Sequence, residues 1–262
     1  MAGLNLIVCL ASAAACVTIN AIGDLVTTLK DSSREYAPPQ LSRRGPTLWK
    51  LFLLRALFVV LGLVAWFVTQ HLIGARAYHG TIEDGILSLL TPVHQYLLDH
   101  AGARNALLIT SSLGIDSLAV FLLLRSIFGP TIRPFLGLLV VFGLRQIFQA
   151  LCVLPEPEKM IWVYPGFPSL LVTYGVSNDL FFSGHTALAV FGAVELARLR
   201  RGLIPLGIAI AVFEVVAVLA LRAHWTMDVY AGAVTALLVA LVAGPMARPV
   251  DRLLGRITGA QR

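Results

Sequence analysis

Charged residues are scarce in this sequence: they make up only 13% of its 262 residues, whereas hydrophobic residues make up 58%. A soluble domain contains about 25% charged residues and about 45–50% apolar residues. Both departures argue against an ordinary soluble globular domain. The composition instead predicts one helical domain that is embedded in a lipid bilayer and has short loops between its helices.

Cysteine is also scarce, and it occurs only at Cys9, Cys16 and Cys152. No Cys-x-x-Cys pair and no mixed histidine and cysteine spacing is present, so we expect no metal site, no other cofactor and no disulfide framework. The apolar N-terminal stretch lacks a preceding basic region, which favours a retained helix over a cleaved signal peptide. The net charge of +6 comes from basic residues between apolar segments, which is typical of a membrane protein rather than of a nucleic-acid-binding one.

Apolar segments of about 20 residues, the length that a helix needs to cross a bilayer, recur along the chain. The predicted spanning segments are 4–29, 48–73, 105–128, 133–153, 183–199, 203–222 and 226–246. The first is the weakest, because it contains Asn5, Asn20 and Asp24, and it is either a spanning helix or a surface segment. We therefore predict an all-α, polytopic membrane bundle with six core transmembrane helices and an additional N-terminal helix. Segment 82–100 has helical spacing but is too short to span, which predicts a helix at the membrane surface.

The predicted organisation is a hydrophobic segment with a basic linker at 1–47, a membrane domain at 48–246 and a basic cytoplasmic tail at 247–262. Basic residues are divided unequally between alternate loops, with 14 Lys and Arg on one set and 4 on the other. The positive-inside rule places the first set in the cytoplasm. The loops beside His185 and His224 then lie on the non-cytoplasmic face, which is lumenal, periplasmic or exoplasmic.

His224 and Asp228 are four residues apart at the predicted outer start of a helix, so their side chains share one face. The carboxylate can hold one imidazole nitrogen and leave the other free to attack an electrophile. The alternative is an interfacial histidine beside an aspartate that caps the helix. The spacing predicts a nucleophile with the residue that orients it, and it leaves the structural alternative open.

The segment Ser183-Gly184-His185-Thr186 precedes another predicted helix. Ser183 suits the N-cap position, Gly184 allows a ligand to approach the backbone, and the helix N-terminus at Thr186 suits a phosphate group. His185 would then point into the same pocket as an acid and base, although a serine cap beside a surface histidine is the alternative. Taken with His224 and Asp228, the segment predicts phosphoryl transfer through a phospho-histidine.

Three stretches carry a resemblance to a known family. They are Asn178-Asp179-Leu180-Phe181-Phe182-Ser183-Gly184-His185-Thr186, then His224-Trp225-Thr226-Met227-Asp228, and the Arg145-Gln146 pair followed by Leu154-Pro155. Over 48–246 the chain resembles the sphingomyelin synthase branch of the type 2 phosphatidic acid phosphatase (PAP2) superfamily. The resemblance implies that His224 attacks a lipid phosphate, that Asp228 orients it and that His185 transfers the proton. It also implies a site on the lumenal or exoplasmic face.

The chain lacks two motifs of the lipid phosphatases in that superfamily, Lys-x6-Arg-Pro and a Ser-Arg before the second histidine. Their absence favours a transferase that moves phosphocholine, or a related phospho-alcohol, from a phosphatidylcholine-like lipid to ceramide or diacylglycerol. Trp225 stands where the branch has tyrosine, which leaves the acceptor open. Two alternatives remain: a lipid phosphatase or phospholipase C-like hydrolase that uses water, and a non-catalytic lipid-binding or transport protein.

Several charged residues fall within predicted membrane segments, where an unpaired charge is costly and is therefore expected to be functional. Arg145 either pairs with Glu214 or contacts the lipid phosphate. Arg222, two residues before His224, is either a phosphate ligand or an arginine whose side chain extends to the membrane interface. Asp179 is expected to support the head-group site.

Aromatic residues near the motifs are candidates for a cage around the quaternary ammonium of choline. They are Trp162, Tyr164, Phe167, Tyr174 and Trp225. All but Trp225 lie within 154–181, a loop that we expect to form an ordered cap over the site. For each of them the alternative is an aromatic belt at the membrane interface.

Overall fold

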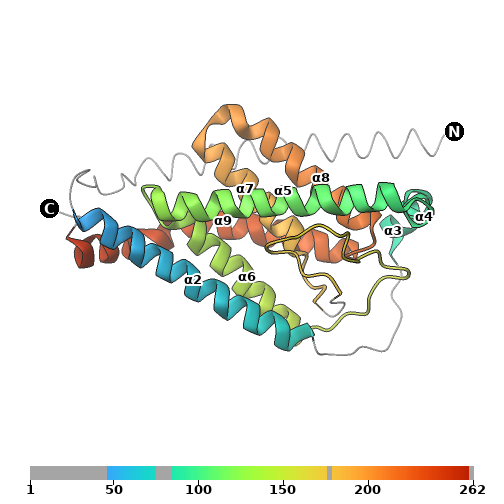
Figure 1. The fold of residues 1–262 in the computed structure, drawn as a ribbon, viewed down its shortest axis with the longest axis horizontal. Coiled ribbons are helices and arrows are strands. Elements are labelled where there is room, and N and C mark those ends of the chain that lie inside the picture. The colour runs from blue at the N-terminus through green and yellow to red at the C-terminus, as the bar shows by residue number, and fades with distance from the viewer. Residues whose placement is uncertain (1–45, 75–83, 176–178, 260–262) are drawn as a thin grey trace. The chain divides into compact units, whose positions relative to one another are not determined.

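Eight α-helices and no strand occupy the residues that the computed structural model describes, which are 46–74, 84–175 and 179–259 (Figure 1). The helices are α2 (Pro46–Gly74), α3 (Gly85–Leu89), α4 (Thr91–Asp99), α5 (Ala101–Phe128), α6 (Arg133–Leu151), α7 (Gly184–Leu199), α8 (Ile204–Ala220) and α9 (Thr226–Thr258), and a short 3-10 turn, η1 (Arg201–Leu203), follows α7. The all-α class is confirmed over these ranges. The N-terminal helix predicted at 4–29 and the motif residue Asn178 lie outside them.

Five of the described helices are long and apolar enough to cross a membrane, and they fit a multi-pass integral membrane protein. These spans are Leu48–Leu72, Ala101–Phe128, Arg133–Leu151, Arg201–Ala220 and Thr226–Thr258. The prediction of six core spans is not confirmed, because α7 has only 16 residues. At 1.5 Å per residue, α7 is about 24 Å long, which is shorter than the hydrocarbon core of about 30 Å.

Helix α7 occupies the centre of the bundle, where it contacts α5, α6, α8 and α9. Close packing against α6 depends on Gly137, since a Cβ atom there would lie only 2.1 Å from the Phe191 ring of α7. Most α7 side chains are buried, whereas α2 exposes many large apolar side chains at the periphery. The short helix is therefore enclosed by the longer ones, and its N-terminus is held inside the bundle.

At one end of the bundle, the beginning of α2 and the turn between α5 and α6 meet the last part of α9 (Figure 1). The Asp251 carboxylate accepts a hydrogen bond of 2.9 Å from the backbone N–H of Ile132 and lies 3.6 Å from Arg55. These contacts stabilise α9 as far as Thr258, although the helix contains two prolines. The predicted tail at 247–262 thus begins as helix, whereas the sequence pattern ends the span at 246.

The opposite end is covered by α3 and α4, two short helices in place of the single surface helix predicted over 82–100. Proline in the first turn of α4 supplies no N–H to continue α3, so a second helix begins there. The Asp84 carboxylate caps α3 through Ile86 N–H at 3.0 Å and reaches the first turn of α9 through Thr226 N–H at 2.7 Å. Burial raises the pKa of Asp84, but the hydrogen bonds from Thr226, Leu87 and Ile86 together lower it below its ordinary value.

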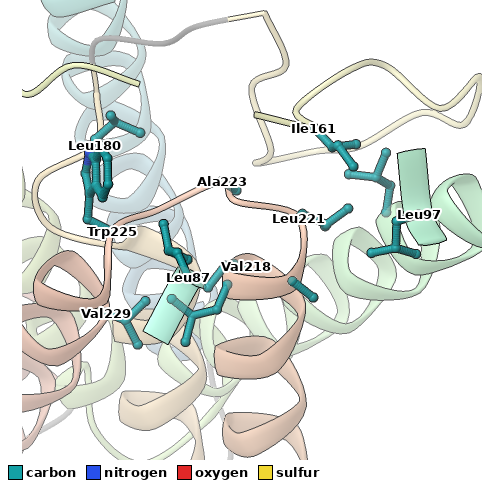
Figure 2. Close-up of a cluster of buried hydrophobic side chains, with 12 residues drawn as sticks. Leu87, Leu97, Ile161, Leu180, Val218, Leu221, Ala223, Trp225 and Val229 are labelled. Atoms are coloured by element: carbon teal, nitrogen blue, oxygen red, sulfur yellow. The ribbon is translucent and has the colours of Figure 1, made fainter. Parts of the chain in front are cut away.

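A buried apolar cluster joins α3 and α4 to the turn between α8 and α9 (Figure 2). Its members include Leu87, Leu97, Ile161, Leu180, Val218, Leu221, Ala223, Trp225 and Val229. His94 of α4 lies beside this cluster, with its Nδ1 atom 3.0 Å from the carbonyl oxygen of Ala220. The cluster flanks His224 on both sides in the sequence and therefore fixes the backbone that carries it.

Candidate active site

A cavity lies where the end of α2, the second half of α6, the start of α7 and the turn before α9 come together. Its polar lining comprises Gln70, Arg145, Thr173, Asp179, His185 and His224, and its apolar lining includes Trp66, Phe142, Met160 and Trp162. Both histidines singled out from the sequence therefore face one space. Over the described ranges, no group of three or more His, Cys, Asp and Glu side chains is arranged to hold a metal ion, and we assign no metal site.

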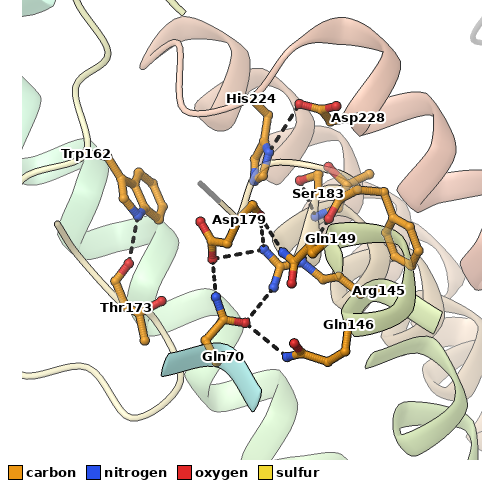
Figure 3. A network of polar contacts seen from close by, with 12 residues as sticks. Gln70, Arg145, Gln146, Gln149, Trp162, Thr173, Asp179, Ser183, His224 and Asp228 are labelled. Atoms are coloured by element: carbon orange, nitrogen blue, oxygen red, sulfur yellow. Dashed lines mark hydrogen bonds and ion pairs between the residues drawn. The ribbon is translucent and has the colours of Figure 1, made fainter. Parts of the chain in front are cut away.

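His224 and Asp228 lie side by side, with His224 Nδ1 3.7 Å from Asp228 Oδ2 (Figure 3). This distance is longer than that of a hydrogen bond, and the two side chains form an ion pair only when the imidazole is charged. The same carboxylate oxygen accepts a hydrogen bond of 2.9 Å from the backbone N–H of Trp225, so Asp228 also caps α9. The capping contact is thus present, and the His224 ring lies beside the same carboxylate without a hydrogen bond to it.

The turn before α7 packs directly on the start of α9. Ser183 Oγ accepts a hydrogen bond of 3.3 Å from Thr186 N–H, as expected of an N-cap residue. The Ser183 N–H donates a bond of 3.0 Å to the carbonyl oxygen of Asp228. A Cβ atom on Gly232 would lie 2.6 Å from the Ser183 carbonyl oxygen, so only glycine permits this approach. Backbone contacts therefore hold the two motifs together.

His185 enters the cavity from the first turn of α7. Its ring lies edge-on against Trp162, with 5.1 Å between the ring centroids. Within the part of the chain that the structure describes, its buried Nε2 atom has no hydrogen-bond partner. A buried imidazole nitrogen without a partner is free to exchange a proton with a bound substrate.

Arg145 is buried and ties α6 to the segment that precedes α7 (Figure 3). It donates hydrogen bonds to the carbonyl oxygens of Phe182 at 2.9 Å and Asp179 at 2.6 Å, and pairs with the Asp179 carboxylate at 3.2 Å. The alternative pairing with Glu214 is not found, because α7 packs between α6 and α8 and Glu214 instead accepts a bond of 2.6 Å from Ser111. Arg145 also lies close to Gly184, where a Cβ atom would be 3.2 Å from its Nε.

A comparison with known protein families gives a match for this chain. Residues 86–245, well over half of the 262-residue chain, match the family model AtPDCT1/2. The chain belongs to the AtPDCT1/2 family. This is the family of phosphatidylcholine:diacylglycerol cholinephosphotransferases. No match was found among curated proteins or among solved structures.

Membership of the AtPDCT1/2 family corrects the resemblance to the sphingomyelin synthase branch of the PAP2 superfamily, which is wrong. The Ser-Gly-His-Thr and His-x-x-x-Asp motifs are short, and they specify side chains for phosphate chemistry rather than an acceptor lipid. Ceramide therefore loses its support as the acceptor. Transfer of a phosphate-linked group between lipids agrees with the AtPDCT1/2 family.

Glu214, Arg222, Trp225 and Tyr164 are predicted site residues that do not line the cavity. The backbone at Arg222 has a positive φ of 53°, and its guanidinium donates to the carbonyl oxygen of Glu158 at 3.1 Å. The Trp225 indole donates to a loop carbonyl oxygen at 2.8 Å, and Tyr164 is 62% exposed. Of the five aromatic candidates for a choline cage, Trp162 alone lines the cavity.

Gln70 contributes to the site although no charge pattern singles it out. It lies near the end of α2, outside the part matched by the AtPDCT1/2 family, and is 4% exposed. Its Oε1 accepts bonds of 3.1 Å from Arg145 and Gln146, and its Nε2 donates to the Asp179 carboxylate. An amide inside an apolar span is the signal that identifies it, since neutral polar groups in a membrane also require partners.

Proposed function

We propose that the protein transfers phosphocholine between phosphatidylcholine and diacylglycerol through a covalent intermediate on His224. The observation that carries the proposal is one cavity lined by His185 and His224, with the buried Asp228 carboxylate beside His224 Nδ1. This arrangement supplies a nucleophile, an orienting carboxylate and an acid and base. The two lipids are supported by membership of the AtPDCT1/2 family.

In the first step, Nε2 of His224 attacks the phosphorus of phosphatidylcholine while the bond from phosphorus to the glycerol oxygen breaks. The electron pair of that bond goes to the glycerol oxygen, which takes a proton from His185 and leaves as diacylglycerol. Burial, together with the nearby His224 and Arg145, lowers the pKa of His185 to about 3 in the free protein, so we assign the uptake of this proton to the complex with the anionic phosphate. His224 then carries phosphocholine on a positively charged ring. The Asp228 carboxylate, 3.7 Å from Nδ1, stabilises that charge.

In the second step, the hydroxyl group of another diacylglycerol gives its proton to His185, and its oxygen attacks phosphorus. The bond from phosphorus to Nε2 breaks, and its electron pair returns to the imidazole of His224. A new phosphatidylcholine leaves, with both histidines in their starting protonation states. The reaction is therefore an exchange of head groups that needs no further reactant.

Binding of the head group is assigned to two parts of the cavity. The phosphate is assigned to the N-terminus of α7 at Gly184 and His185, which line the cavity and where the helix dipole favours an anion, while Ser183 and Thr186 hold that turn through the Ser183 cap. The choline ammonium is assigned to the faces of Trp66 and Trp162, which line the cavity and can bind a cation. Arg145 acts indirectly, since its hydrogen bonds to Asp179 and the Phe182 carbonyl position the turn.

We place the site on the non-cytoplasmic face of the membrane. Gln70 and His224 lie at the ends of α2 and α9 that are opposite to Arg55 and Asp251. Among the basic residues predicted to be cytoplasmic, Arg125, Arg133 and Arg252 lie in described parts of the chain at the Arg55 end, where Arg55 donates to the carbonyl oxygen of Gly129 and pairs with Asp251. This agrees with the positive-inside rule. A phosphatidylcholine of the outer leaflet would then enter the cavity directly from the bilayer.

The test is transfer of choline-labelled head group from phosphatidylcholine to added diacylglycerol in proteoliposomes. We expect His224→Ala to lower the rate at least about 1,000-fold, since it removes the nucleophile. His100→Ala is the matched control, because His100 is an exposed histidine outside the cavity. A His224→Ala protein as active as the control would contradict the proposal.

The same assay separates the other acceptors. Labelled sphingolipid formed from added ceramide would show that ceramide is an acceptor, and free phosphocholine formed without any acceptor lipid would show hydrolysis. We expect labelled phosphatidylcholine with the acyl chains of the added diacylglycerol to be the main product. No labelled product under any condition would favour a lipid-binding protein without catalysis.

A further inference from the structure

An apolar groove continues from the cavity that holds His224. The two spaces share four lining residues, Trp66, Phe142, Leu171 and Leu188. The rest of the groove is lined by side chains of α2, α5 and α6, and no charged or polar side chain is among them. A wall that changes from charged to wholly apolar suits an amphiphile, with its polar head in the cavity and its hydrocarbon part in the groove.

Helices α2 and α6 present the two spaces in the same order along the chain. On α2, Gly62 lines the groove and Gln70 lines the cavity. On α6, Phe135 lines the groove and Arg145 lines the cavity. Since a helix rises 1.5 Å per residue, Phe135 lies about 15 Å below Arg145 along α6.

Helix α5 shows the reverse order, as expected for a helix that runs the other way through the bundle. Its Ile115 lines the cavity and its Leu123, two turns later, lines the groove. The lining residues of all three helices therefore place the groove between the head-group site and the opposite face of the membrane. With a hydrocarbon core about 30 Å thick, the far end of the groove, about 15 Å from Arg145 along α6, lies near the middle of the bilayer.

We propose that this groove binds one acyl chain of the phosphatidylcholine donor while its phosphate is at His224, an inference that rests on the proposed function. The glycerol oxygen that leaves from phosphorus is joined to that chain, so binding the chain orients the bond that breaks. An acyl chain in the groove also contacts the apolar rings of Trp66 and Phe142, which line both the groove and the cavity. The groove is thus a substrate subsite that sets acyl-chain preference.

Leu139 is the position at which the groove can be closed by substitution. It lies on α6, is 38% exposed and has its Cδ1 atom 3.6 Å from the point where Gly62 would carry a Cβ. A tryptophan there would fill the space between α6 and α2. Ile147 is the matched control, since it is on the same helix, is 55% exposed and lines neither space.

The experiment compares dioleoyl-phosphatidylcholine with dihexanoyl-phosphatidylcholine as the donor, using dioctanoylglycerol as the acceptor. For Leu139→Trp we expect the ratio of the long-chain to the short-chain rate to fall at least about tenfold, as for loss of several methylene contacts. The ratio for Ile147→Trp should equal that of the wild type. An unchanged ratio in Leu139→Trp would overturn the groove assignment. If the wild type transfers from neither donor, the proposed function fails instead.

Photolabelling tests whether the groove binds an acyl chain without relying on catalysis. A phosphatidylcholine with a diazirine in one acyl chain should label the α6 peptide that contains 135–142, and excess dioleoyl-phosphatidylcholine should compete with it. Leu139→Trp should lose this labelling, whereas Ile147→Trp should keep it. Labelling of this peptide that is not competed, or that is equal in both variants, would show only bulk lipid at the helix and would overturn the proposal.

Discussion

Replacing Asp228 with asparagine separates the helix cap from the proposed chemistry. Asparagine keeps an oxygen that can accept the Trp225 N–H bond of 2.9 Å, but it removes the negative charge 3.7 Å from His224 Nδ1. Two unit charges at that distance interact by about 4 kcal/mol at an effective dielectric constant of about 20, which corresponds to about 1,000-fold in rate. Because the proposed intermediate places a positive charge on the His224 ring, kcat should fall by about 100- to 1,000-fold while KM changes little.

The assay is transfer of choline-labelled head group by the wild type, Asp228→Asn and Asp228→Ala, with thermal unfolding of each. Asp228→Ala should lose the cap as well as the charge, and loss of a cap costs about 1 kcal/mol of stability. Asp228→Asn should therefore unfold close to the wild-type temperature and still lose activity. A value of kcat for Asp228→Asn within about threefold of the wild type would refute the reasoning.

Three further predictions concern residues that hold the site in place. Gln70→Leu removes the acceptor of Arg145 Nη1 and of Gln146 Nε2, so it should cost about 1.5–3 kcal/mol of stability and lower transfer at least about tenfold. Thr69→Val, on an exposed neighbour, should do neither. Gly232→Ala places a Cβ 2.6 Å from the Ser183 carbonyl oxygen, so transfer and unfolding temperature should both fall, while Gly143→Ala, which meets nothing within 4 Å, should match the wild type. Asp84→Asn should lower the unfolding temperature at neutral pH. Since the folded state lowers the pKa of Asp84, the carboxylate stabilises the fold above the ordinary Asp pKa of about 3.9, and the difference from wild type should shrink as the pH falls below that value. A difference that persists or grows at low pH would contradict this assignment.

Much of the fold follows from hydrophobicity alone, because a bilayer requires continuous apolar helices. The predicted segments 48–73, 133–153 and 203–222 agree with α2, α6 and α8 to within a few residues. Hydrophobicity alone, however, could not show that α7 has only 16 residues and is enclosed by the longer helices. Nor could it show that α9 continues past 246, since that extension depends on the Asp251 contacts with α2 and the turn before α6.

The site was predictable where chemistry depends on local spacing. Ser183 caps α7, because that relation is fixed within one helical turn. The spacing of four residues also brings His224 next to Asp228, although His224 lies in the turn before α9 and not on the helix. Contacts between residues that are far apart in the sequence leave no such spacing pattern. Arg222 does not line the cavity despite its closeness to His224 in sequence, because its guanidinium donates instead to the Glu158 carbonyl oxygen and to Thr91.

Acceptor identity was also beyond the two motifs, because a phosphate-transferring histidine pair serves several alcohols equally well. Only the match over 86–245 separates the AtPDCT1/2 family from the sphingomyelin synthase branch. Gln70 and Trp66 lie before that range, so the cavity contains residues that the family match does not reach. Their contribution to the cavity depends on the packing of α2 against α6, which the sequence does not show.

The central claim is that His224 carries phosphocholine during turnover, and the most direct test is to trap that species. The wild-type protein is incubated with choline-labelled phosphatidylcholine in the absence of diacylglycerol, quenched in base, and digested for mass spectrometry. We predict an acid-labile phosphocholine adduct on the peptide that contains His224, discharged by adding diacylglycerol and absent from His224→Ala. Transfer at the normal rate with no adduct, or with an adduct on another residue, would contradict the account.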